Sequence, residues 1–346
     1  MSRTRVLVVS AMRNEGPYLL EWLAHHIAAG VSDFLIYSND CEDGSDAMLG
    51  LLHAAGVVEH VPQPGGPKVQ WRALKDAETR EQCRAADWIA VMDCDEFINL
   101  RKPLDSIPQL VSQLGEAEAI TLPWRLFGSS GAVRASDAPT TGRFTRAAPQ
   151  PCAYPVAASF FKTLFRRKSR FHRLGIHRPR QRDPGRHGAA LWVDGSGQPL
   201  PESFALNEAR INLYGLSPAT DLVQLNHYSL RSAEEFMVKR ARGLPNRGRA
   251  LDMAYWVERN LGAEEDRSIE RMAAGTTAAL GQLRAIPGLS ALEVAARRWH
   301  REKFAALMQD RAEWQLFGRL LMVPEAQPLA PALARELLAL YRGKNG

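Results

Sequence analysis

The stretch that decides the fold is residues 5–40, RVLVVSAMRNEGPYLLEWLAHHIAAGVSDFLIYSND. Residues 6–10 are a short apolar run followed by a polar loop, which is typical of a buried strand. A helix is predicted next, because Pro17 suits a first helical turn, Gly30 suits the position just past a helix end, and the apolar residues between them recur at helical spacing. Residues 34–37 then form a second apolar run. The stretch therefore predicts strand, helix and strand.

The same alternation continues along the chain. A second helix is predicted within 44–56, a third strand at 57–61, a third helix at 71–86 and a fourth strand at 88–92. Strands that alternate with helices are typical of a parallel sheet covered by helices. The sequence therefore predicts an α/β protein with a mainly parallel central sheet.

Polar residues follow three of these strands where each one ends. In open parallel sheets, ligands bind outside the carboxyl ends of the strands, so we expect these loops to share one edge. The first loop contributes Arg13, Asn14 and Glu15, the second Asn39, Asp40 and Asp43, and the fourth Asp93, Asp95 and Glu96.

The segment WIAVMDCDEF, residues 88–97, runs from an apolar strand into three acids. Burying an unpaired carboxylate costs several kcal/mol, so three acids at a strand end indicate a positive partner nearby: a lysine, a helix N-terminus or a metal ion. Mg²⁺ and Mn²⁺ prefer oxygen ligands and bind to few protein carboxylates when phosphates complete the shell. Asp93 and Asp95, separated by one residue, fit a metal that bridges the protein to a diphosphate.

The composition limits the classes of function. The chain has 346 residues, 45% of them hydrophobic, and a net charge of +6, which suits anionic partners such as nucleotides. Its four cysteines are scattered and predict neither a zinc site nor a disulfide framework. No apolar stretch approaches the roughly 20 residues that span a bilayer. We expect a cytoplasmic protein that meets a membrane, if at all, only peripherally at its inner face.

The second half of the chain changes character. Residues 160–165 alternate apolar and basic residues, which predicts a half-exposed strand, and residues 178–201 predict a long loop. After Ser232 the pattern is helical, so we expect a catalytic domain over residues 1–235 and a helical region over 236–346. The amphipathic stretch 290–323 fits three fates: packing on the catalytic domain, homodimer formation, or contact with an anionic membrane, in that order.

Four motifs in order along the chain carry a family resemblance. They are MRNEGPYLLEWLAHH, IYSNDCEDGSD, DWIAVMDCDEF and LNHYSLRSAEEFMVKRARG. Together they resemble the family-2-type glycosyltransferases of the GT-A fold, in particular a bacterial subgroup with a D-x-D-E-F motif, and are similar also to the family-92 enzymes. The resemblance covers about residues 5–245. It implies a nucleotide-sugar donor (UDP is the first guess), a divalent metal, Mn²⁺ or Mg²⁺, and transfer of a sugar to a hydroxyl of a glycan or other acceptor.

The resemblance also implies roles for individual residues. Asp95 would coordinate the metal, Asp93 would reach the metal or the donor ribose, and His227 would return to the metal late in the chain. The nucleoside pocket would be lined by Arg13, Asn14, Glu15 and Asn39. The carboxylate of Glu15 or Asp43 would accept a hydrogen bond from the ribose or the base. Lys239 and Arg242, three apart on one predicted helix, would face the diphosphate, with Lys162 and Arg166 as further candidates. His177 would contact the donor sugar or the acceptor. By residue type, Trp124 and Phe127 suit either stacking against a sugar face or packing in the core.

The catalytic base stays open in the sequence. An inverting transfer needs a carboxylate on the acceptor side, and Glu96, Asp137, Asp194 and Glu202 all qualify by residue type; a retaining enzyme needs none. We also expect Asp95→Ala to abolish transfer and leave the fold intact. Removing one of the clustered acids at the strand end relieves their mutual repulsion and opens no cavity.

Two other classes of protein share part of this pattern. A D-x-D phosphotransferase would carry this motif near its N-terminus, whereas here it follows three strands. A basic protein that binds nucleic acid or membrane without catalysis would use the Arg-rich stretch FRRKSRFHRLGIHRPRQR, residues 165–182. Acids at a shared edge would repel phosphate unless a metal lies there, so we expect no nucleic-acid partner.

Overall fold

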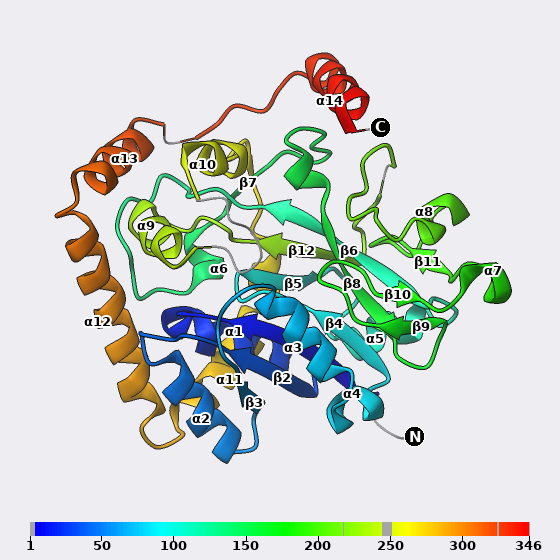
Figure 1. Ribbon diagram of the computed structural model, residues 1–346, viewed down its shortest axis with the longest axis horizontal. Coiled ribbons are helices and arrows are strands. Elements are labelled where there is room, and N and C mark those ends of the chain that lie inside the picture. The colour runs from blue at the N-terminus through cyan, green and yellow to red at the C-terminus, as the bar shows by residue number, and fades with distance from the viewer. Residues whose placement is uncertain (1–3, 217, 244–250, 324, 346) are drawn as a thin grey trace.

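A computed structural model describes residues 4–216, 218–243, 251–323 and 325–345. Its centre is a nine-stranded sheet in the order β3-β2-β1-β4-β8-β6-β12-β5, with β11 paired to β6 (Figure 1). The pairings β1–β2, β2–β3, β1–β4, β6–β12 and β6–β11 are parallel, and those of β4 with β8, β8 with β6 and β12 with β5 are antiparallel. The predicted α/β fold with a mainly parallel sheet is confirmed.

The strands of this sheet are β1 (Val6–Met12), β2 (Asp33–Ser38), β3 (Glu59–Pro62), β4 (Trp88–Val91), β5 (Glu96–Leu100), β6 (Ala119–Leu126), β8 (Phe161–Arg166), β11 (Trp192–Val193) and β12 (Val223–His227). Two small ribbons lie outside it. They pair β7 (Arg146–Ala147) with β13 (Glu264–Glu265), and β9 (Phe171–Arg173) with β10 (Arg180–Gln181).

Helices cover both faces of the sheet, so successive residues of a central strand enter different cores. On β1, Val6 and Val8 face one core and Leu7 and Val9 the other, all fully buried. The first core takes side chains of α1 (Gly16–Ala28), α2 (Ser45–Ala54), α5 (Ile107–Gln113), α11 (Ala273–Arg284) and α12 (Leu289–Leu307). The second takes side chains of α3 (Val69–Ala77), α4 (Glu81–Ala85) and α8 (Glu202–Leu206).

The chain after β12 is mainly helical, as predicted. It holds α9 (Ala233–Arg242), α10 (Met253–Arg259), α11, α12, α13 (Arg311–Met322) and α14 (Pro331–Asn345). Helices α11 and α12 pack on α1, so Leu289 and Ala296 belong to the main core (Figure 1). Packing on the catalytic domain, the first of the three expected fates, is therefore observed for this part of the region. The expected domain boundary at 235–236 falls inside α9.

Three local expectations differ from the structure. The strand at 160–165 is buried, not half-exposed, because Lys162 finds carboxylate partners inside the protein. The helix predicted over 71–86 divides into α3 and α4, with a break at residues 78–80. The stretch 178–201 contains β10, α7 (Pro184–His187) and β11, so it is not a plain loop. The remaining short helix before β8 is α6 (Thr140–Arg143), and 3₁₀ turns lie at Val156–Ser159 and Ser268–Met272.

Candidate functional site

The loops after β1, β2 and β4 meet at one edge of the sheet and open into a pocket of about 600 Å³. That volume falls within the range of small-molecule and cofactor sites. The wall is completed by α3, the segments before β8 and after β9, β12, α9 and α10. Ten of the residues expected in the site line this pocket: Arg13, Glu15, Asn39, Asp93, Asp95, Trp124, His177, His227, Lys239 and Arg242.

Asp95 is held by a lysine from the far end of the fold. The Nζ atom of Lys239 lies 2.5 Å from Oδ2 of Asp95 and also donates to the Ser229 carbonyl at 2.7 Å. Lys239 reaches this point because Ser232 caps the start of α9: its side chain accepts the Glu235 N–H, and the Glu235 carboxylate accepts the Ser232 N–H. Burial alone raises the pKa of Asp95, but Lys239 and His227 outweigh it and hold that pKa well below its usual range. Asp95 is therefore an anion at neutral pH.

Asp93 has a second lysine. Lys162, whose side chain is fully buried, donates to Oδ2 of Asp93 at 2.9 Å, and Gln70 donates to Oδ1 at 3.1 Å. Burial lowers the pKa of Lys162, but Asp93 and Glu96 more than compensate, so it rises above its ordinary value. The Asp93 side chain keeps 35% of its surface exposed to the pocket. It is the more accessible acid of the pair.

Glu96 lies behind these acids, not in the pocket. Its side chain is fully buried, and its Oε2 atom accepts the Asp93 backbone N–H at 2.9 Å. Burial, reinforced by Asp93 and Asp95 and opposed by Lys162, raises the pKa of Glu96 well above its usual range. Glu96 does not line the pocket, and its side chain holds the turn that carries Asp93.

A pair of arginines anchors the first loop. Arg242 contacts Glu15 at 2.5 Å, and Arg231 approaches the same carboxylate at 3.7 Å while its guanidinium stacks 3.5 Å from the centre of the Tyr18 ring. Arg242 also donates to the Arg13 carbonyl at 2.5 Å. Glu15 is thus tied to α9, and the Glu15 carboxylate is already occupied by cations of the protein.

Aromatic and imidazole rings form the wall on the side of β6 and β12. The Trp124 ring lies 4.1 Å from that of His227 and 5.5 Å from that of His177, centre to centre. Burial, aided by Lys162, lowers the pKa of His177 to about 4, and burial also lowers the pKa of His227. Both imidazoles are therefore neutral at pH 7. The Nε2 atom of His227 faces Asp95 at 3.5 Å, and its Nδ1 atom is buried with no hydrogen-bond partner among the described residues.

Two expected nucleoside residues hold the loops instead of lining the pocket. Asn14 adopts a left-handed φ of 51°, and its side chain accepts the Glu42 N–H at 2.8 Å. Asp43 is fully buried and accepts from the Gly16 N–H and from His300, each at 2.9 Å. The Asn14 carboxamide and the Asp43 carboxylate hold the loops together, and neither residue lines this pocket.

Several further candidates lie elsewhere. Arg166 stacks on Trp88 and donates to backbone carbonyls, and Phe127 is fully buried against Tyr228. None of the other expected bases lines the pocket: Asp137 pairs with Arg301, Asp194 accepts from backbone N–H groups, and Glu202 is an exposed residue of α8.

Sequence reasoning missed part of the wall. Gln70, Arg178, Arg180, Glu208, Tyr255 and Arg259 line the pocket, and Arg231 supports it from behind. Arg231 lies in the same motif as His227, LNHYSLRS, so its place in that motif could have indicated a role near the site. Gln70 comes from α3, which carries no polar pattern pointing to a site. Among lining carboxylates, Asp40 and Glu208 have no ion pair with lysine or arginine within the described residues.

Residues of the described ranges form no group of three or more His, Cys, Asp or Glu side chains that could hold a metal. At the end of β4, the described residues offer the Asp93 and Asp95 carboxylates, with the His227 ring beside them. Two carboxylates suit Mg²⁺ or Mn²⁺ when phosphate oxygens and water complete the shell. The donor set fits such an ion only in company with a phosphorylated ligand.

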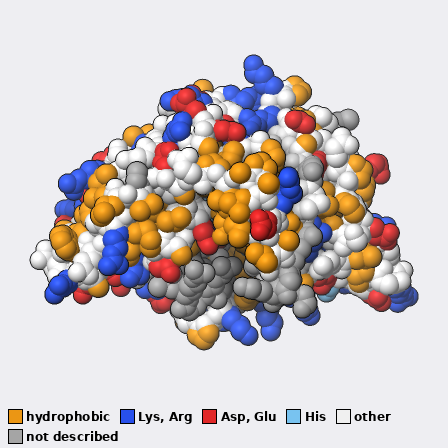
Figure 2. Space-filling model, turned by 90° about the horizontal axis from the view of Figure 1, so that it is seen from above, with side chains coloured by type: hydrophobic (Ala, Val, Ile, Leu, Met, Phe, Trp, Pro, Cys, Tyr) orange, Lys and Arg blue, Asp and Glu red, His pale blue; other side chains and the backbone are white. Residues whose placement is uncertain are grey.

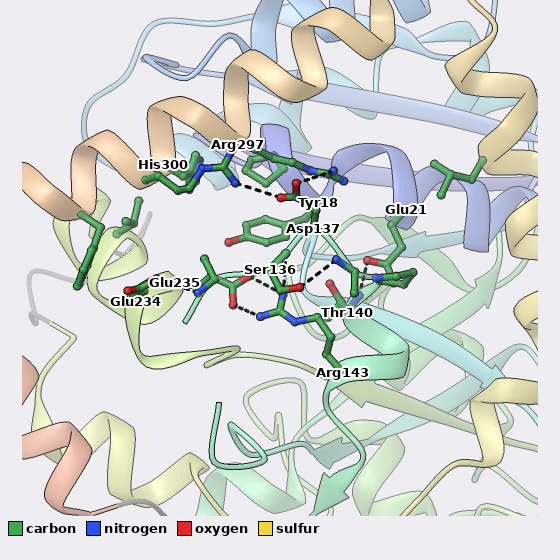
Figure 3. A pocket seen from close by; sticks show the side chains of 18 of the residues that line it. Tyr18, Glu21, Ser136, Asp137, Thr140, Arg143, Glu234, Glu235, Arg297 and His300 are labelled. Atoms are coloured by element: carbon green, nitrogen blue, oxygen red, sulfur yellow. Dashed lines mark hydrogen bonds and ion pairs between the residues drawn. The ribbon is translucent and has the colours of Figure 1, made fainter. Parts of the chain in front are cut away.

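A second, smaller pocket lies between α1, α9, α12 and residues 135–140 (Figure 3). Its volume is about 90 Å³, far below that of the pocket described above. Two ion pairs join charged side chains of its lining: Arg143 with Glu235 at 2.7 Å and Arg301 with Asp137 at 3.2 Å. This pocket is a seam where the C-terminal helices meet the catalytic half, not a site for a nucleotide.

Comparison with known sequences decides the family. The sequence model of glycosyltransferase family 92 matches residues 9–191, which is more than half of the chain. The chain belongs to glycosyltransferase family 92. The matched range contains the loops after β1, β2 and β4, and therefore Arg13, Glu15, Asp93 and Asp95. Curated relatives include family 92 proteins of Ricinus communis, 27% identical over 36% of this chain, and of Oryza sativa subsp. japonica, 26% identical over 27%.

These relatives are much longer than the matched segment, which spans 23% and 16% of their respective lengths. Among solved structures, the S. aureus protein TarS is 12% identical, with a TM-score of 0.34 over 87% of this chain and 89% of that one. Another structure of TarS is in complex with UDP-GlcNAc, with a TM-score of 0.28 over 47% of this chain and 46% of that one. Scores this low carry no argument about this chain.

The C-terminal helices leave apolar side chains on the surface. Hydrophobic side chains gather on the side seen from above (Figure 2), toward which α13 and α14 lie in Figure 1. The exposed large hydrophobic side chains are Trp314, Leu321 and Met322 on α13, and Leu333 and Leu340 on α14. None of the helices in the described ranges combines the length and the apolar character that crossing a bilayer requires.

Proposed function

We propose that this protein is a metal-dependent glycosyltransferase that moves a sugar from a nucleotide-sugar donor, UDP-linked in the first instance, to a hydroxyl group of a glycan or other acceptor. The observation that carries the proposal is the pair Asp93 and Asp95, held by separate lysines at the carboxyl end of β4 in a pocket of about 600 Å³. Membership of family 92 supports it. The UDP assignment rests on the family resemblance alone.

The nucleoside is proposed to lie over the loops after β1 and β2. Arg13 and Asn39 line that side of the pocket, and Asp40 adds a carboxylate that has no lysine or arginine partner within the described residues. Glu15 supports this wall through its contact with Arg242. A ribose hydroxyl or a base N–H can donate to such a carboxylate, and the arginine can pack on the base.

The diphosphate is proposed to lie at the centre, beside Asp93 and Asp95. When bound there, a Mn²⁺ or Mg²⁺ ion supplies positive charge to the diphosphate as the leaving group becomes more negative. Lys239 and Arg242 lie on the same side of α9 and line the pocket, so they add fixed positive charge at that point. Lys162 keeps Asp93 oriented from behind, since its ammonium is fully buried.

The acceptor is proposed to approach from the other side of β4. Trp124, on β6, presents an aromatic ring to the pocket, and a sugar face can stack on it. His177 and His227 flank Trp124 as neutral rings. If transfer inverts the anomeric centre, Glu208 is the base that we propose, because it lines the pocket and forms no ion pair with lysine or arginine within the described residues.

The proposal is tested by a transfer assay with the whole chain. UDP-, GDP- and dTDP-sugars are incubated with Mn²⁺ and a panel of oligosaccharide acceptors, and free nucleoside diphosphate is measured. We expect release with one donor class, dependent on acceptor and abolished by EDTA. No release with any donor, together with no binding of any nucleoside diphosphate, would contradict the proposal.

A further inference from the structure

Residues 166–187, from the end of β8 to α7, carry nine lysines and arginines and a single acid, Asp183. Several of these cations are exposed on the β9–β10 ribbon and its flanks. We call Lys168, His172, Arg173, Arg180 and Arg182 the basic surface. Of the cations in this segment, only Arg170 forms an ion pair with a carboxylate, that of Glu118, within the described residues.

The basic surface borders a hollow of about 600 Å³. Its walls include Lys168, His172 and Arg182, with Phe171 and Ser169 between them. Glu118 is the carboxylate among its lining residues, and Arg170 neutralises it. A concave surface with several cations and no free acid in its lining attracts an anionic ligand more strongly than a flat one does, because its low-dielectric walls focus the field.

The hollow and the pocket that holds Asp93 and Asp95, called the donor pocket below, are lined by neighbouring residues of one segment. Arg180 and Arg182 are two residues apart on β10 and the residue after it, so they lie on the same face, while Gln181 between them is buried. Arg180 lines the donor pocket, and Arg182 lines the hollow. His177, on the wall proposed for the acceptor, belongs to the same segment. Figure 1 shows β9 and β10 near α7 and α8, at the opposite end of the molecule from α12.

We propose that the basic surface binds the acceptor, and that the acceptor is an anionic saccharide chain bearing carboxylate or phosphate groups. The chain lies along β9 and β10, and its end passes Arg180 to reach Trp124 and the donor. This inference rests on the proposed transferase function and names its acceptor class. The donor's own phosphates are held around Asp93, Asp95 and Lys239, so the cations of the basic surface remain available for a second anionic ligand.

The test measures saccharide binding directly. Fluorescently labelled octagalacturonate supplies carboxylates, a phosphorylated mannooctaose supplies phosphates, and maltooctaose is the neutral control. Binding is measured by anisotropy at 50 and 200 mM NaCl with the whole chain. We expect at least one anionic octamer to bind more tightly than maltooctaose, and its binding to weaken as salt rises; the tighter of the two identifies the anionic group.

A matched pair of variants locates the binding. Lys168→Gln/Arg173→Gln/Arg182→Gln removes three charges from the basic surface, and Arg311→Gln/Arg319→Gln/Arg335→Gln removes three exposed charges from α13 and α14. Exposed ion pairs each contribute little, so the first variant should lose on the order of tenfold in affinity and the second almost none. Equal binding by both variants, or equal binding of maltooctaose, would overturn the inference.

UDP binding with Mn²⁺ is measured in parallel, since neither variant alters a residue of the donor pocket. Normal UDP binding without saccharide binding would refute the anionic acceptor alone, whereas absence of UDP binding in the unaltered chain would refute the transferase proposal. A 20-nucleotide RNA and vesicles of phosphatidylglycerol complete the set. Binding of either one that the first variant abolishes, with no binding of the octamers, would replace the acceptor by that partner.

Discussion

The three acids after β4, Asp93, Asp95 and Glu96, indicate a positively charged partner nearby. The positive partners that the structure shows are lysines: Lys162 for Asp93, and Lys239 for Asp95. Each carboxylate is therefore compensated before any ligand arrives. Glu96 lies 3.5 Å from the same Lys162, and burial, reinforced by Asp93 and Asp95, raises the pKa of its carboxyl group well above the usual range.

The pairing reverses the expectation that Asp95→Ala leaves the fold intact. Asp95 and Lys239 are both largely buried, so removing the carboxylate leaves an uncompensated buried ammonium. We predict that Asp95→Ala lowers the free energy of unfolding by roughly 3–5 kcal/mol, as measured by urea denaturation. Asp95→Ala/Lys239→Met should recover most of that loss. An unchanged midpoint for the single variant would show that the pair is not buried in solution.

The buried histidines make the free energy of unfolding depend on pH. Burial lowers the pKa of His25 and of His177 from an ordinary 6.5 to about 4, and lowers those of His26 and His227 too. Between pH 6.5 and 4 the unfolded chain therefore binds more protons than the folded one, and stability falls as the pH falls. Glu96 acts in the opposite direction, because its raised pKa makes the folded state bind a proton more tightly.

We predict a progressive fall in the urea midpoint from pH 7 to pH 4.5, since four histidines oppose one glutamate. Glu96→Gln removes the opposing contribution, so its midpoint should fall more steeply over the same range. A midpoint that stays constant or rises toward pH 4.5 would contradict the assignment of these histidines as neutral and buried.

Much of the site could be read from residue type and position at strand ends. Arg13, Asp93 and Asp95 follow predicted strands, and parallel strands bring their carboxyl ends together. Asp43 and Asn14 share that position, yet their side chains hold neighbouring loops, and only the folded geometry distinguishes the two uses. The strand that carries Lys162 is predicted to be half-exposed but is buried. The carboxylate partners of Lys162 lie 66 or more residues earlier in the chain, so local sequence does not reveal them.

At the scale of elements, the meeting of α1 and α12 fixes the first loop of the pocket. Gly16 begins α1, and a Cβ atom placed on it would lie 2.5 Å from the Cβ of Ala296 on α12. On the same side, Asp43 joins the Gly16 N–H to His300 of α12. The C-terminal helices therefore support the loop that carries Glu15 and Arg13.

We predict that Gly16→Ala destabilises the protein by about 1–3 kcal/mol, because the added methyl group must displace α12. Ala296→Gly removes the atom that it meets, so the double variant should regain part of the loss despite the weaker helix propensity of glycine. Both are measured by urea denaturation as a double-mutant cycle. Purely additive effects would show that the two helices do not touch at this point.

For the whole molecule, the alternation of strands and helices predicted the sheet and its two covered faces. The antiparallel insertion of β8 between β4 and β6 was not predictable, because pairing partners far apart in sequence leave no mark on local periodicity. The amphipathic pattern at 290–323 indicates one long helix or a helix pair, and the structure shows the pair α12 and α13. It did not show that Trp314 would stay 61% exposed.

We propose that the exposed face of α13 forms a homodimer in solution, which would cover Trp314, Leu321 and Met322. Light scattering after size exclusion should give twice the chain mass of 38.4 kDa. Trp314→Ser/Met322→Ser should shift the mass to that of one chain without changing the far-UV circular dichroism. A monomer in the unaltered protein would contradict the dimer, and sedimentation with anionic vesicles would favour the membrane instead.

The most direct test of the central claim is titration calorimetry of UDP into the whole chain, with Mn²⁺ and then with EDTA. Asp93→Asn keeps the shape of a lining acid but removes its charge, and Asp137→Asn does the same to an acid outside the pocket. The account predicts UDP binding that needs Mn²⁺, weakens at least tenfold in Asp93→Asn and is unchanged in Asp137→Asn. UDP binding that is equal in EDTA and in Asp93→Asn would contradict a metal-assisted diphosphate site at the end of β4.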